Sequence, residues 1–236
     1  MTLQKKLIRW GIVVSALLLV VFVMFEVEQK ATFQSWNLPL SGKVIIIDPG
    51  HGGIDGGASV GSVIEKDITL PISLKLRDYL QEQGALVLMT RETDTDLADK
   101  RLKRVRDRKR SDLQNRAKFI NESEADLYIS IHVNAFPQKK SKGSQTFYSP
   151  KFEENQHLAK LIQTELRDSL NNTQREAKPL TNVFLVKKAE KPGVLVEVGF
   201  ISNPDERINL QRKTYQDDLA VSIYSGIIKY FLKENN

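Results

Sequence analysis

The side chains best suited to chemistry in this sequence are a few histidines and glutamates at the ends of apolar segments. His51 lies in a glycine-rich segment directly after the apolar run Val44–Ile47. His132 ends a second apolar run, and Glu197 lies inside a third. Imidazole and carboxylate groups bind catalytic zinc, and they are also the usual general acids and bases. The pattern therefore favours a metal-assisted hydrolytic site.

Glu65 adds a second carboxylate between the glycine-rich segment and the first predicted helix. Two imidazoles and one carboxylate match the ligand set of many hydrolytic zinc sites, which keep a further position for water. The remaining carboxylate can then act as general base on that water. We assign Glu65 as a ligand and Glu197 as the base, although the residue pattern also allows the reverse. Glu197 could alternatively form a structural salt bridge.

Other polar residues near these groups are weaker candidates. Asp48 and Asp55 could orient a ligand imidazole from behind, or they could simply stabilise turns in the glycine-rich segment. Asn134 and Arg116 are candidates for contact with the substrate. His157 falls on the polar side of an amphipathic segment, so we interpret it as a surface residue.

Strands and helices are predicted to alternate along residues 43–236. The predicted strands cover residues 43–48, 85–89, 126–131 and 193–198, with an extra strand at 144–148, and the predicted helices cover 67–83, 111–121, 153–170 and 215–232. This order predicts an α/β fold, a single domain with a mostly parallel twisted sheet and helices on both faces. Parallel strands end along one edge, so the groups that follow them can share a crevice.

Composition limits the remaining possibilities. The chain has 236 residues, of which 27% are charged and 41% hydrophobic, as in an ordinary globular domain. The lack of cysteine excludes disulfides, thiolate zinc ligands and a cysteine nucleophile. A net charge of +6 favours anionic partners or surfaces. The basic run 100–110 is either a solvated face or a docking surface for anions, and its lack of stacking aromatics argues against nucleic acid.

The N-terminal segment has the pattern of a membrane anchor. Residues 10–25 are almost entirely apolar, and Lys5, Lys6 and Arg9 precede them. We predict an uncleaved signal anchor at 1–25, a linker at 26–42 and a catalytic domain at 43–236. The basic flank predicts a cytoplasmic N-terminus with the domain on the outer face of the membrane. A cleaved signal peptide is the alternative, but no small-residue cleavage motif follows the apolar run.

Four segments, in this order, resemble zinc-dependent N-acetylmuramoyl-L-alanine amidases. They are residues 47–53, 65–67, 130–135 and 196–204. The resemblance implies one Zn²⁺ held by His51, Glu65 and His132, with Glu197 catalytic. It further implies a peptidoglycan substrate, cleaved at the amide between the lactyl group of N-acetylmuramic acid and L-Ala of the stem peptide.

Within that family the layout is most similar to the germination-specific spore-cortex amidases. The similarity rests on a short N-terminal anchor, one catalytic domain and no added wall-binding repeats. It implies stem-peptide removal on the way to muramic δ-lactam, in the cell wall or the intermembrane space of a forming spore, and it leaves room for an activating protein partner. The rival hypotheses are a zinc peptidase acting on another amide and a non-catalytic wall-binding or scaffold protein.

Overall fold

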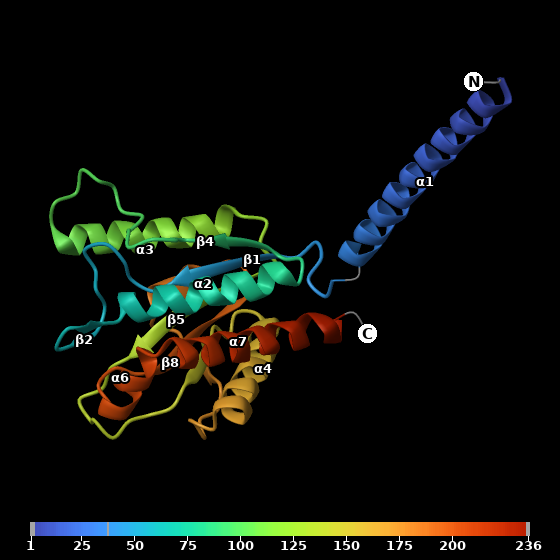
Figure 1. The fold of residues 1–236 in the computed structure, drawn as a ribbon. Coiled ribbons are helices and arrows are strands. Elements are labelled where there is room, and N and C mark those ends of the chain that lie inside the picture. Colours follow the sequence, from blue (N-terminus) through green and yellow to red (C-terminus); the bar gives the residue numbers. More distant parts are fainter. Residues whose placement is uncertain (1–2, 37, 235–236) are drawn as a thin grey trace.

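Strands and helices alternate along most of the chain in the computed structural model (Figure 1). The structure describes residues 3–36 and 38–234, and the side chains of residues 10–26 and 38–232. The elements are α1 (Leu3–Trp36), β1 (Val44–Pro49), β2 (Ser59–Val60), β3 (Val63–Ile64), α2 (Lys66–Glu82), β4 (Leu86–Met89), α3 (Val105–Glu122), β5 (Leu127–Asn134), β6 (Gln145–Tyr148), α4 (Glu153–Leu170), β7 (Lys178–Pro179), α5 (Phe184–Lys188), β8 (Gly193–Phe200), α6 (Pro204–Leu210) and α7 (Lys213–Glu234).

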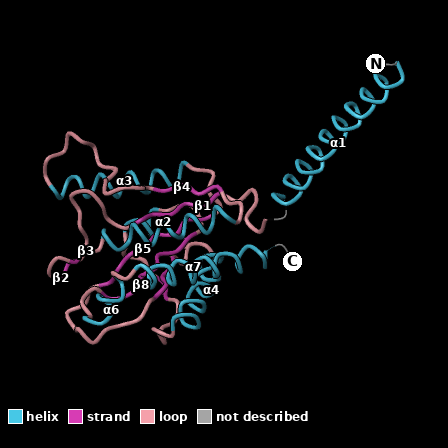
Figure 2. Tube along the Cα trace, viewed as in Figure 1, coloured by secondary structure: helices cyan, strands magenta, loops and turns pink. Residues whose placement is uncertain are grey.

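The centre of the fold is a six-stranded sheet with the order β4-β1-β5-β8-β6-β7. The strands β4, β1, β5 and β8 are parallel to their neighbours, whereas β6 runs antiparallel to β8. The sheet is therefore mixed but mostly parallel, as predicted. Figure 2 shows these strands running through the middle of the molecule, with helices around them. A separate two-stranded hairpin, β2-β3, follows the glycine-rich segment.

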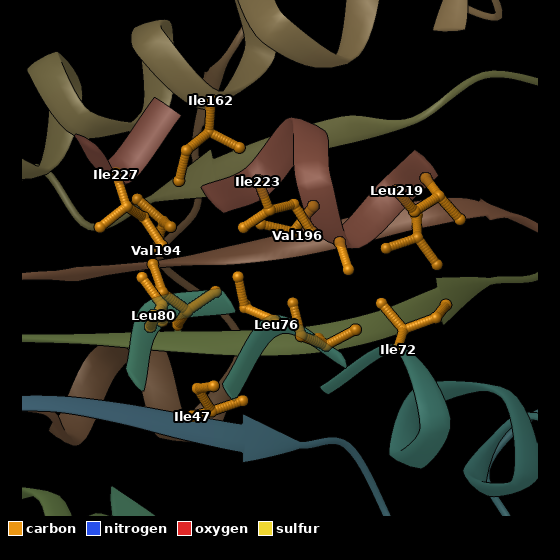
Figure 3. Packing of buried hydrophobic residues seen from close by; sticks show 14 of the residues in the cluster. Ile47, Ile72, Leu76, Leu80, Ile162, Val194, Val196, Leu219, Ile223 and Ile227 are labelled. Carbon is orange, nitrogen blue, oxygen red and sulfur yellow. The ribbon is translucent and has the colours of Figure 1, made fainter. Parts of the chain in front are cut away.

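Helices cover both faces of the sheet. On one face α2, α4 and α7 pack on the larger core, where Leu76, Val196 and Ile223 meet (Figure 3). On the other face α3 and α5 close a smaller core around Ile46 and Tyr128. Strand β1 supplies both cores because successive side chains of a strand point to opposite faces. Its continuous apolar sequence thus reflects burial on both sides.

The boundaries of two elements differ from prediction in ways that affect the site. Helix α3 begins at Val105 and not at residue 111, so half of the basic run is helical. Lysine and arginine are good helix formers, and no glycine or proline interrupts them here. Strand β5 continues to Asn134, so His132 lies within the strand and not after it. The short elements β2, β3, β7, α5 and α6 were not predicted, because each is too short to carry a periodic pattern.

Helix α1 precedes the α/β fold and extends away from it in Figure 1. Its side chains at 10–26 are exposed. Over the described residues, no helix is both long and apolar enough to cross a membrane. The predicted anchor begins at residues 1–2, which lie outside the described part of the chain. Helix α1 continues to Trp36, into the segment for which the sequence predicts a linker.

Candidate active site

The candidate residues converge at the carboxyl ends of the parallel strands. His51 follows β1, and Glu65 directly precedes α2. His132 on β5 and Glu197 on β8 are direct neighbours across the two strands. Neighbouring residues in register point to the same face of a sheet, so these side chains share one side. The site lies at the strand edge where the sequence predicts it, since parallel strands end together.

His51, Glu65 and His132 form a compact cluster. The Nε2 atom of His51 lies 3.2 Å from Oε2 of Glu65, and Nδ1 of His132 lies 3.1 Å from Oε1 of the same carboxylate. One ligand atom from each residue can be chosen so that all lie within 4.8 Å of one another. Tetrahedral ligands at the usual zinc distances lie about 3.3 Å apart. The spacing of the donor atoms therefore fits a zinc ion.

Glu65 is held rigidly in this cluster. Its side chain is 5% exposed, and backbone N–H groups of Ala58 and Val133 donate to its two oxygens over 2.8 Å and 2.9 Å. Burial would raise the pKa of Glu65, but hydrogen bonds from His132 and His51 lower it well below the usual range. Glu65 thus stays ionised and fixed in place, as a metal ligand must.

The loop that carries His51 approaches the cluster very closely. His51 has a φ of 61°, in the left-handed region that residues other than glycine rarely adopt. A Cβ atom at Gly57 would lie 2.5 Å from Oε2 of Glu65 and 2.6 Å from Cδ2 of His51. A Cβ atom at Gly50 would lie 2.6 Å from Cε1 of His132. The glycines are therefore required because side chains there would displace the ligands.

Asp55 orients the imidazole of His51. Its Oδ2 atom lies 2.9 Å from Nδ1 of His51, which leaves Nε2 to face Glu65. Burial would lower the pKa of His51, but hydrogen bonds and charge from Asp55 and Glu65 raise it to about 9. The same negative charge would also attract a metal cation to this position. Lys109 of α3 also contacts Asp55, with Nζ 3.0 Å from Oδ2.

Arg116 lies beneath the loop and not in the substrate crevice. It is 2% exposed, and its guanidinium donates to Asp48, to Asp112 and to the carbonyl oxygens of Pro49 and His51. The structure therefore places it where it supports the backbone of His51, and its burial leaves little of its side chain accessible to a substrate. Asp48 likewise contacts Arg116 and not an imidazole, so its effect on the ligands is indirect.

Asp48 is the anion at the centre of this buried network. Burial would raise the pKa of Asp48, but the Arg116 charge and hydrogen bonds from Ser130 and Thr90 lower it to about 2. Ser130 donates over 2.6 Å and Thr90 over 2.7 Å. Sequence reasoning missed both hydroxyls in this role, although Ser130 lies in the predicted strand 126–131, two positions before His132.

Arg91 is a second buried arginine that sequence reasoning missed. It is 4% exposed, and it donates to the carbonyl oxygens of Pro49 and Gly50 over 3.0 Å and 2.9 Å. It thus also supports the backbone of the glycine-rich loop. Its position two residues after the predicted strand 85–89, at the same edge of the sheet as His51, is the signal that could have found it.

Glu197 differs from Glu65 in having a free oxygen. Its Oε2 atom is buried and has no hydrogen-bond partner among the described residues. Burial raises the pKa of Glu197 to about 7, against the opposing charge of His132. A carboxyl group that titrates near neutral pH and has an unused lone pair can accept a proton from a reactant. The predicted salt-bridge alternative is not seen among the ion pairs of the described chain.

The last sequence candidates lie around the cluster. Asn134 ends β5, and its carbonyl oxygen accepts a hydrogen bond from Ile201 over 2.9 Å. It is partly exposed at the same strand edge, where a substrate could reach it. His157 lies on α4, with its ring 6.0 Å from that of Tyr230. It does not belong to the cluster, in agreement with the interpretation from sequence.

Comparison with known proteins gives the family. Residues 45–229 match the profile of the N-acetylmuramoyl-L-alanine amidase family. The chain belongs to this family. The match covers all four segments on which the resemblance was based. The predicted amidase identity is thereby confirmed, and the histidine and glutamate cluster is consistent with the metal site of such enzymes.

Individual relatives agree over most of the chain or nearly all of it. A germination-specific N-acetylmuramoyl-L-alanine amidase of Bacillus subtilis is 49% identical over 234 residues, which cover 99% of each chain. The solved structure of the CwlD amidase from Clostridioides difficile, in complex with the GerS lipoprotein, is similar with a TM-score of 0.79 and 43% identity. That match covers 81% of this chain and 100% of the other. A further amidase from Clostridium difficile 630 has a TM-score of 0.71 and 30% identity, covering 82% and 98%.

Proposed function

We propose that this amidase hydrolyses the bond between the lactyl group of N-acetylmuramic acid and L-Ala of the stem peptide, with Zn²⁺ held by His51, Glu65 and His132 and with Glu197 as the general base. The observation that carries the proposal is the free, buried Oε2 of Glu197 on the strand next to the ligand cluster. Family membership supports the reaction, and the donor spacing supports the metal.

The two carboxylates can be assigned because their surroundings differ. Both oxygens of Glu65 accept backbone hydrogen bonds and face an imidazole. That carboxylate has little freedom to rotate and serves as a ligand. Glu197 lacks such partners and has a pKa of about 7. We therefore assign it as the base, and this difference in surroundings supports that assignment over the reverse one.

The chemistry then divides between the metal and the protein. When bound, Zn²⁺ supplies Lewis-acid chemistry, polarising the carbonyl of the scissile amide and lowering the pKa of water. Glu197 takes a proton from the attacking water at its free Oε2. It then returns the proton to the nitrogen of L-Ala as that group leaves. Asp55 keeps the proton of His51 on Nδ1, so that the lone pair of Nε2 stays available to bind the cation.

Metal content and product analysis test this proposal together. The purified chain should contain about one zinc per molecule, lose activity to a chelator and regain it with added zinc. Mass spectrometry of digested peptidoglycan should show free L-Ala amino termini and intact glycan strands. A different cleaved amide would indicate the zinc peptidase alternative. Full binding to the wall with no cleavage by the zinc-loaded chain would indicate the non-catalytic one.

We further propose that the chain acts on spore-cortex peptidoglycan. Support comes from the germination-specific relative of Bacillus subtilis, which aligns over 99% of both chains and so shares the same layout. The amidase should then act on cortex stem peptides before muramic δ-lactam forms. Spores that lack the gene should contain cortex without this lactam, and normal lactam content in such spores would contradict the proposal.

An activating protein partner is also proposed. The structure of the CwlD amidase of Clostridioides difficile has been solved in complex with the GerS lipoprotein. Because this chain has the same fold, a lipoprotein of that kind could bind it as well. The partner should raise turnover or zinc affinity when added to the purified chain. If the chain is equally active in the presence and in the absence of the lipoproteins that co-purify with it, no activating partner is needed.

Membrane attachment through the N-terminal segment is the last part of the proposal. The apolar residues 10–25 of α1 are exposed rather than packed on the catalytic domain. We propose that this segment holds the domain at the outer face of a membrane, with the N-terminus in the cytoplasm. The full chain should sediment with membranes, and a chain that starts at residue 43 should not. Equal distribution of both chains would refute the anchor.

A further inference from the structure

One cation of the basic run reaches the metal site. Lys109 projects from the second turn of α3, and its Nζ atom lies 3.0 Å from Oδ2 and 3.3 Å from Oδ1 of Asp55. The same Oδ2 atom lies 2.9 Å from Nδ1 of His51. A continuous chain of contacts therefore runs from the helix to the imidazole ring.

We propose that Lys109 is a positioning residue for the metal, because it holds Asp55 and thereby fixes the ring of His51. This inference rests on the proposed role of His51 as a metal ligand. It gives one residue of the basic run a function that charge patterning alone does not indicate.

Asp55 needs this support because it has few other partners. Its side chain is 17% exposed, and the remaining hydrogen bond to it, from the N–H of Gly57, is long at 3.3 Å. An ionised carboxylate can only accept hydrogen bonds, so it requires the proton of His51 to be on Nδ1. The lone pair of Nε2 then faces Glu65 and the metal position. The ammonium group of Lys109 contacts both oxygens of Asp55 and so limits the rotation of this carboxylate.

The other cations of the run lie away from this chain of contacts. Arg101 and Arg108 pair with Asp99 and Asp96. The remaining cations are exposed and belong to none of the ion pairs found in the described ranges; they are Lys100, Lys103, Arg104, Arg106 and Arg110. Lys103 is therefore a matched control, since it is an exposed lysine six residues earlier in the same run. Removing it changes the net charge equally but leaves Asp55 in place.

The test is the zinc dissociation constant of the full-length chain, measured by competition with a chromogenic chelator. Asp55→Ala should raise the constant ~10–100-fold, as is typical when the partner of a ligand imidazole is lost. Lys109→Met should raise it about fivefold, which matches the upper range for a partly exposed ion pair. Lys109→Arg should restore most of the loss, and Lys103→Met should stay within about twofold of the parent.

A double variant shows whether Lys109 acts through Asp55. In the Asp55→Ala background, Lys109→Met should cause no further change, because the carboxylate that it holds is absent. A parent-like constant for Lys109→Met overturns the proposal. The proposal is also overturned if Lys103→Met raises the dissociation constant as much as Lys109→Met does. It is likewise overturned if Lys109→Met raises the constant about fivefold again in the Asp55→Ala background. If the parent chain itself binds no zinc, the proposed function fails instead, so the two failures can be told apart.

Discussion

Arg116 donates a hydrogen bond to the carbonyl oxygen of His51 over 2.6 Å, so a buried cation supports the backbone of a metal ligand. The same guanidinium contacts Asp48 and Asp112 over 2.7 Å and 2.8 Å. His51 can adopt its unusual φ of 61° because contacts of this kind hold the loop around it. The stability of the network and the geometry of the site are thus linked.

Replacement of Arg116 should strongly destabilise the protein. Arg116→Met leaves Asp48 and Asp112 as buried charges without their cation, and removal of one partner from such a network typically costs ~3–5 kcal/mol. The free energy of unfolding in urea measures the loss. Arg110→Met is the control, since that arginine is exposed on the same helix and should change stability by less than ~0.5 kcal/mol. Equal effects of the two substitutions would contradict a structural role for Arg116.

Asp48 should make stability depend on pH in the acid range. Its pKa in the folded protein is about 2, below the reference value of 3.8. The group therefore contributes stability that is fully present above the reference value and is lost as pH falls towards 2. The contribution is about 2 kcal/mol, from a difference of nearly two pKa units.

Urea unfolding at a series of pH values between 5 and 2 checks this expectation. The parent should lose about 2 kcal/mol more than Asp48→Asn across the range, since the variant has no group that titrates at this position. Contributions of other carboxyl groups occur in both proteins and cancel. Parallel curves for the two proteins would show that Asp48 is not ionised against Arg116 in the way described.

Gly57→Ala should weaken metal binding, whereas Gly61→Ala should not. Both glycines have positive φ values, 74° and 62°, so both substitutions carry the same backbone cost of ~1–2 kcal/mol. Only the Cβ atom at Gly57 would collide with Glu65 and His51, since nothing lies within 4 Å of that position at Gly61. We expect zinc affinity to fall at least ~10-fold in Gly57→Ala alone. Similar zinc affinities in the two variants would contradict close packing of the loop on the ligands.

Much of the site could be predicted from sequence because it depends on the topology of the sheet. His51, His132 and Glu197 each belong to an apolar strand or follow one, and parallel strands end at one edge. Their meeting therefore follows from the fold class alone. Glu65 could be added because it lies just before the helix that follows the same loop.

The supporting residues could not be found in this way. Lys109 reaches Asp55 only because α3 starts at Val105, earlier than the sequence indicates, and that start sets which side of the helix faces the site. The pairing of Arg116 with Asp48 joins residues 68 positions apart. Such contacts depend on how a helix is rotated against the sheet, which a hydrophobic pattern determines only roughly.

The central claim is that Glu65 holds the metal and Glu197 performs the proton transfer. The most direct test measures zinc content and turnover on purified peptidoglycan for Glu197→Gln and Glu65→Gln side by side. Glu197→Gln should retain about one zinc per chain and lose ~10²–10⁴-fold in turnover, while Glu65→Gln should lose the zinc itself. Zinc retained by Glu65→Gln and lost by Glu197→Gln would contradict the account and reverse the two roles.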